Sequence, residues 1–188
     1  MNLNIWWRFK LARFWLFFKQ RGHALAALHE VLALDPRNHL ALSTLGFLHG
    51  DTQQYAEAES YFRRALEVTP DNADTLFNLG YIVQRLERHD DAIATFDAAI
   101  NKSKTLDRAW FGKGMSLAAM KRHAEAVPVF ERAAKLQPMN PHALYELGLQ
   151  YHALGQPDKV EETVARLKEF DPKATQQLID VTKTQSAG

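Results

Sequence analysis

A glycine recurs at intervals of 34 residues over most of this 188-residue chain, at Gly46, Gly80, Gly114 and Gly148. Two alanines and a phenylalanine keep the same register further along each interval: Ala58, Ala92 and Ala126; Phe62, Phe96 and Phe130; Ala65, Ala99 and Ala133. Self-similarity at a fixed period of about 20–50 residues is the signature of a repeat architecture, in which one supersecondary unit is copied along the chain. This period constrains the fold more strongly than any other feature of the sequence.

The residue types at these positions suit pairs of packed helices. Glycine leaves room for a partner helix to approach closely, alanine is small enough for helices to cross, and phenylalanine fills the space between units. Proline ends a helix because it lacks an amide proton and its ring clashes with the preceding turn. Four second helices are therefore predicted to end just before one of the prolines that share the register, which are Pro36, Pro70, Pro138 and Pro172; Lys104 stands at this position in the third repeat, where a looser turn is expected.

The pattern resembles the tetratricopeptide repeat family, whose 34-residue unit is a pair of antiparallel helices. The resemblance implies an all-α fold, an α-solenoid of about five antiparallel helix pairs with a C-terminal capping helix. The predicted repeats are residues 5–38, 39–72, 73–106, 107–140 and 141–174, followed by a cap at residues 175–185. We expect these units to form a single solenoid domain over residues 1–188.

No catalytic or metal-binding motif is recognisable. The chain has no cysteine, which removes thiol nucleophiles and cysteine metal sites. His29 and Glu30 begin like the helix motif of a zinc protease, but Ala33 stands where the second histidine must be. We therefore expect a protein that is not an enzyme and that uses no cofactor or metal.

The charged residues are unevenly distributed. The formal net charge is only +1, which gives no general attraction to nucleic acid, so no nucleic-acid partner is expected. Residues 1–22, however, contain no acid and five basic residues, which are Arg8, Lys10, Arg13, Lys19 and Arg21. The start of the chain is thus a local concentration of positive charge.

The resemblance implies a concave groove lined by the fifth and ninth residues of each first helix. At these positions the sequence is mostly aromatic or apolar, and the predicted peptide groove comprises Phe47, Phe77, Tyr81, Phe111, Met115, Tyr145 and Leu149. Such a surface suits an apolar or amphipathic segment of a partner protein, because each buried anchor contributes about 1.5–3 kcal/mol before ordering costs. The alternative is that these side chains pack partly against neighbouring helices.

The helix predicted to open the first repeat is rich in aromatic residues. Its predicted docking face comprises Trp6, Trp7, Arg8, Phe9, Arg13, Phe14, Trp15, Phe17 and Phe18. One helix cannot bury so many aromatic side chains against one neighbour, and an exposed apolar face of this size marks an interaction site. Four uses stay open: contact with an anionic membrane surface, docking on another protein, a homodimer through this helix, and local packing at the end of the solenoid.

A membrane-spanning helix needs roughly 18 or more consecutive apolar residues. The longest such candidate here runs only from Phe14 to Phe18. We expect a cytoplasmic protein that can meet the inner face of a membrane peripherally.

Together these features predict a protein–protein interaction scaffold or adaptor. Its groove would bind a peptide segment, and its N-terminal helix would tether it to a membrane surface or a larger complex, in the assembly of a membrane-associated complex. The alternative is a regulatory subunit of an enzyme complex that docks through the N-terminal helix.

Overall fold

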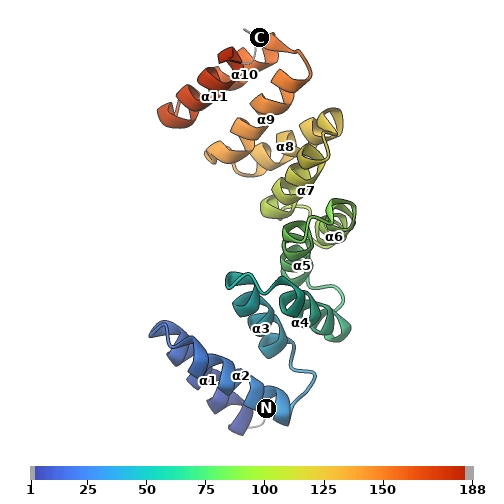
Figure 1. Cartoon of the computed structure of the whole chain (residues 1–188), viewed down its shortest axis with the longest axis vertical. Helices are drawn as coiled ribbons and strands as arrows, with labels where there is room; N and C mark the ends of the chain where they lie inside the picture. Colours follow the sequence, from blue (N-terminus) through green and yellow to red (C-terminus); the bar gives the residue numbers. More distant parts are fainter. Residues whose placement is uncertain (1–2, 185–188) are drawn as a thin grey trace. The chain divides into compact units, whose positions relative to one another are not determined.

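The computed structural model describes residues 3–184, and within them the chain forms eleven α-helices and no strand (Figure 1). In chain order the helices are α1 (Leu3–Phe17), α2 (Arg21–Leu34), α3 (His39–Asp51), α4 (Tyr55–Val68), α5 (Ala73–Arg85), α6 (His89–Lys102), α7 (Asp107–Ala119), α8 (His123–Leu136), α9 (Pro141–Ala153), α10 (Pro157–Lys168) and α11 (Pro172–Thr184). The predicted fold class, an all-α solenoid with a C-terminal capping helix, is confirmed.

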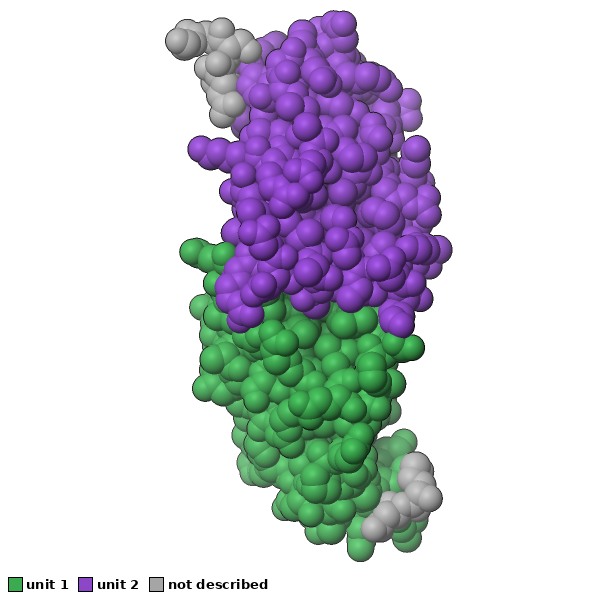
Figure 2. Space-filling model, turned by 90° about the vertical axis from the view of Figure 1, so that its right-hand side faces the viewer, with its two compact units in different colours: residues 1–87 green, residues 88–188 purple. Residues whose placement is uncertain are grey.

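The chain divides into two compact units, residues 1–87 and 88–188 (Figure 2). In the first unit α1 packs on α2, α3 on α4, and α4 on α5. In the second unit each helix from α6 to α10 packs on the next, and α11 packs against both α9 and α10. The single domain of five repeats stays a prediction.

The turn after each first helix repeats one backbone conformation. The residues with positive φ are Lys19, Gln53, Glu87, Lys121 and Gly155, with φ between 56° and 66°. They follow one another at the same 34-residue interval as the sequence motif. Four of the five carry a side chain in a left-handed conformation that costs a residue other than glycine about 1–2 kcal/mol.

Replacing Gln53 with glycine is expected to raise the free energy of unfolding by about 0.5–1 kcal/mol. Glycine adopts the φ of 61° found there without steric strain, and the exposed Gln53 side chain contributes little packing that would be lost. The matched control is Gly155→Ala at the corresponding turn, where φ is +66° and a Cβ would meet nothing within 4 Å. That substitution should destabilise the chain. Urea unfolding of the two variants measures both changes, and an equal response to both would contradict the conformational explanation.

The phenylalanines of the second helices are fully buried, as are the alanines that flank them. Phe62, Phe96 and Phe130 are at most 1% exposed. A Cβ added at Gly46 would come within 2.9 Å of the Phe62 ring, and one at Gly114 within 2.7 Å of the Phe130 ring. The Phe62 and Phe130 rings thus occupy the space that the glycine of the first helix of their own pair leaves free, and the Phe96 ring lies in the same way against Gly112 of α7.

The capping helix begins at Pro172 rather than at residue 175, where the 34-residue register places it. The Asp171 carboxylate accepts a hydrogen bond from the Ala174 amide at 2.9 Å and so caps the start of α11. Leu178 of α11 is fully buried and covers Gly148, where an added Cβ would lie 2.5 Å from its Cδ2. Residue 185, the predicted end of the cap, lies outside the described residues.

Candidate functional site

In the first unit, the predicted groove residues belong to α3, which carries Phe47, and to α5, which carries Phe77 and Tyr81. Phe47 is 61% exposed and Tyr81 is 45% exposed, whereas Phe77 is half-buried. Leu40, one helical turn before Ser43 and two before Phe47, is also 55% exposed. Large apolar side chains this exposed gain nothing from the fold itself, so this face is available to a ligand.

A shallow cavity of about 330 Å³ lies between α3 and α5 at the base of this face. It is lined by His39, Leu40, Ser43, Thr44 and Phe47 of α3 and by Asn72, Asp74, Thr75 and Asn78 at the start of α5. The ring Nε2 of His39 lies 3.1 Å from the Thr75 hydroxyl and joins the two helices there. The cavity is therefore polar on the α5 side, and on the α3 side its apolar lining consists of Leu40 and Phe47.

In the second unit the predicted groove residues are less accessible. Phe111, Met115, Tyr145 and Leu149 are all half-buried and pack against the core of that unit. The Phe111 ring lies 5.7 Å from the Phe130 ring at an angle of 63°. One side of each residue thus supports the fold, as the packing alternative predicts, and the other side remains at the surface.

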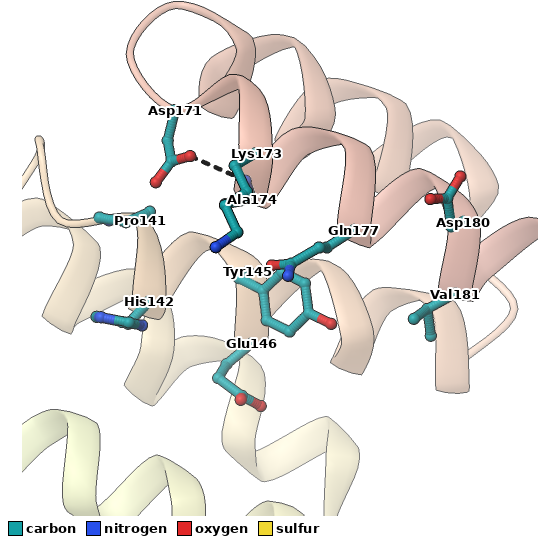
Figure 3. A pocket seen from close by; sticks show the side chains of 10 residues that line it. All are labelled: Pro141, His142, Tyr145, Glu146, Asp171, Lys173, Ala174, Gln177, Asp180 and Val181. Atoms are coloured by element: carbon teal, nitrogen blue, oxygen red, sulfur yellow. Dashed lines mark hydrogen bonds between the residues drawn. The ribbon is translucent and has the colours of Figure 1, made fainter.

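A larger cavity, of about 720 Å³, lies between α9 and α11 (Figure 3). Helix α9 contributes Pro141, His142, Tyr145 and Glu146, and α11 with its capping residue contributes Asp171, Lys173, Ala174, Gln177, Asp180 and Val181. Burial raises the pKa of the Glu146 carboxyl above its usual value, an effect that the nearby His142 partly offsets. The sequence predicts only Tyr145 among these residues, because the start of α11 breaks the 34-residue register.

The outer face of α1 carries a continuous apolar stripe. The outer stripe comprises Leu3, Trp7, Leu11, Phe14 and Phe18, which are between 45% and 72% exposed. These residues follow one another at intervals of three or four positions, the spacing of one helical face. Leu3 and Leu11 are absent from the predicted docking face, although the same spacing could have identified them.

The other predicted docking residues divide between the flank of this stripe and the inner side of α1. Trp6, Phe17 and Arg13 are exposed beside the stripe, and the Lys10 ammonium lies 5.3 Å from the centre of the Trp6 ring. On the inner side, Arg8 forms an ion pair with Glu30, Phe9 packs against the core, and Trp15 stacks on His23. The inner residues hold α1 to α2, and the outer ones are free to meet a partner.

Two kinds of site are absent from residues 3–184. No three histidine, aspartate or glutamate side chains are grouped there so as to hold a metal ion. No helix in the same range is both long and apolar enough to cross a membrane.

Sequence models of the tetratricopeptide repeat match three overlapping parts of the chain, residues 38–104, 84–138 and 117–179. Together these matches extend from residue 38 to residue 179 and so cover well over half of the chain. A search of curated protein sequences found no match.

Solved structures with the same fold are numerous. The MamA protein aligns with a TM-score of 0.83 at 20% identity, over 89% of this chain and 92% of its own. YrrB, a tetratricopeptide repeat protein described as having an unusual peptide-binding site, aligns with a TM-score of 0.78 at 23% identity, over 92% and 90% of the two chains. PilW, described as a type IV pilus biogenesis factor, aligns with a TM-score of 0.76 at 25% identity, over 90% and 78%.

Proposed function

Because this chain belongs to the tetratricopeptide repeat family, we propose that it is a non-enzymatic adaptor that holds partner proteins. Repeat solenoids present extended surfaces on which partners bind. Two structural neighbours support this role, since one is described as having a peptide-binding site and another as a type IV pilus biogenesis factor. The adaptor would therefore serve in the assembly of a larger complex.

The observation that carries the proposal is the exposure of large apolar side chains on the first helices. Leu40, Phe47 and Tyr81 gain little from folding because they are exposed, and Leu40 and Phe47 line the same cavity between α3 and α5. This face would take the apolar side chains of a peptide segment, with the polar side of the α3–α5 cavity bonding to its backbone. Phe111, Met115, Tyr145 and Leu149 would offer their accessible edges to the same ligand class in the second unit.

The second part of the proposal concerns α1, which would tether the adaptor to an anionic membrane surface. Exposed tryptophan and phenylalanine suit the headgroup region of a bilayer, and nearby cations attract anionic lipid. The outer stripe supplies the apolar contact. Lys10 and Arg13 lie beside it, in a segment of 22 residues that has five basic residues and no acid.

A phage-displayed peptide library tests the groove. Peptides selected on the wild-type chain are expected to bind at least about tenfold more weakly to the double variant Phe47→Ala/Tyr81→Ala, because two apolar anchors are lost. Fluorescence anisotropy of one labelled peptide measures the change. Both side chains are exposed, so the free energy of unfolding should change by less than about 1 kcal/mol.

The matched control is Met139→Ala, which removes another exposed apolar side chain, 71% exposed, from the loop before α9. It should leave peptide affinity unchanged. If the selected peptides bind the double variant and the wild type equally, the groove does not bind peptides, and the proposal of a peptide-binding adaptor fails.

A further inference from the structure

Another cavity of the second unit, of about 570 Å³, lies between α10 and α11. Its floor is apolar, because Val160 is buried and Val164 and Ile179 are half-buried there. These two helices stand at the C-terminal end of the chain (Figure 1), and within residues 3–184 no helix follows α11. The fold therefore leaves this apolar floor without a helix over it.

The cavity side of α10 corresponds to a face that an inner second helix buries. Ile93 and Ile100 of α6 lie two 34-residue intervals before Glu161 and Lys168 of α10. Ile100 is 3% exposed, and Ile93 packs against the core of the second unit. The repeat thus uses these positions for helix packing, whereas α10 carries an acid at one of them and a base at the other.

The residues on this side of α10 form a single stripe. Glu161, Val164, Ala165 and Lys168 line the cavity and follow one another at i, i+3, i+4 and i+7, the spacing of one helix face. The acid stands at one end of the stripe and the base stands about 10 Å further along the helix. Two small apolar side chains lie between the opposite charges.

The protein itself does not satisfy these charges. In the described part of the chain, no ion pair includes Glu161 or Lys168, and both side chains are exposed. Their neighbours Lys159 and Glu162, by contrast, pair with each other at 2.9 Å outside the cavity. Lys183 of α11 also lines the cavity. The face therefore offers one carboxylate and two ammonium groups to whatever covers it.

A second copy of the chain, running antiparallel, matches this stripe in charge and in shape. If a two-fold axis passes between Val164 and Ala165, Glu161 of each copy lies opposite Lys168 of the other, because the two positions are symmetric about that point. In such an isologous interface one patch serves both copies, so a single stripe supplies two ion pairs. The charges fix the register, and the apolar floors supply the attraction.

We propose that the chain forms a homodimer through the face between α10 and α11, with the two α10 helices antiparallel and Glu161 of each copy paired with Lys168 of the other. Helix α10 of each copy then covers the apolar floor of its partner. This surface is separate from the outer stripe of α1, which lies in a segment of five basic residues and no acid that would repel a second copy of itself. The dimer requires neither the peptide groove nor the membrane tether.

Sedimentation equilibrium of the full-length chain at several concentrations is expected to show a monomer and a dimer in equilibrium. Glu161→Lys and Lys168→Glu should each weaken the dimer at least about tenfold, because both ion pairs become contacts between like charges. An equimolar mixture of the two single variants should dimerise about as well as the wild type, since one variant then has only positive and the other only negative charge at these positions. A fluorescent label on one variant detects the mixed dimer.

The matched control Glu57→Lys makes the same change in net charge on an exposed residue of α4 and should leave the dimer unaltered. Circular dichroism of both single variants should match that of the wild type, because the replaced side chains are exposed. A chain that stays monomeric at every concentration, or folded single variants that do not associate when mixed, would overturn the proposal. A dimer that survives Glu161→Lys and is lost with Trp7→Ser/Phe14→Ser would also overturn it and would place self-association on α1.

Discussion

Replacing Phe130 with alanine is expected to lower the free energy of unfolding of the second unit by about 3–5 kcal/mol. The side chain has no exposed surface, and its ring fills the space beside Gly114 so closely that an added Cβ would lie 2.7 Å away. It also meets the Phe111 ring edge-on at 5.7 Å, a geometry worth about 0.5–1.5 kcal/mol beyond burial.

The distribution of tryptophan allows this loss to be assigned to one unit. Trp110 lies in the second unit, and the other three tryptophans lie in α1. In a background with Trp6, Trp7 and Trp15 replaced by phenylalanine, Trp110 fluorescence during urea unfolding reports on the second unit alone. Met139→Ala in the same background should change the unfolding free energy by less than about 0.5 kcal/mol. A similar small effect of Phe130→Ala would show that the ring does not hold the unit together.

The sequence predicts this core well because the packing is local and periodic. Gly114 and Phe130 are 16 residues apart, and the same pair recurs as Gly46 with Phe62. A signal that appears several times at one spacing identifies contacts that a single occurrence would not. The period of 34 residues then places the helices, and proline at the end of most second helices sharpens their boundaries.

The 34-residue register no longer predicts the structure where the last helix pair, α9 and α10, packs against the capping helix α11. Gly148 is covered not by the second helix of its own pair but by Leu178 of α11. Helix α11 begins at Pro172, where the Asp171 carboxylate accepts the capping hydrogen bond from the Ala174 amide, three residues before the position that the register predicts. The cavity beside Tyr145 follows from that shift, so a strictly periodic interpretation could not have located it.

The orientation of α1 could not be predicted from the sequence pattern either. This helix is apolar on both faces, so no polar face shows which side turns outward. The structure decides it through Ala12, the one buried residue of α1, whose small side chain lets α2 approach. Arg8 and Trp15 then turn inward, although the sequence placed them on the docking face, and Leu3 and Leu11 turn outward.

Substitutions in the outer stripe of α1 are expected to have a second large effect, a loss of membrane binding. Exchanging Trp7 and Phe14 for serine is expected to reduce binding to vesicles containing phosphatidylglycerol at least about a hundredfold, because each ring contributes about 1.5–3 kcal/mol when removed from water. The two side chains are 63% and 50% exposed, so their loss costs the fold little. Co-sedimentation measures binding, and a blue shift of tryptophan emission follows insertion, since α1 carries three of the four tryptophans.

The matched control is Leu40→Ser/Phe47→Ser, which removes two exposed apolar side chains from α3 of the same unit and should leave vesicle binding unchanged. Charge supplies a second criterion. If Lys10, Arg13 and their basic neighbours contribute, binding must fall as salt is raised and must be much weaker on neutral phosphatidylcholine vesicles. Equal binding to neutral and anionic vesicles would remove the electrostatic part of the tether. No binding to either would assign the outer stripe to a protein surface, since five large apolar side chains on one helix face still require a partner.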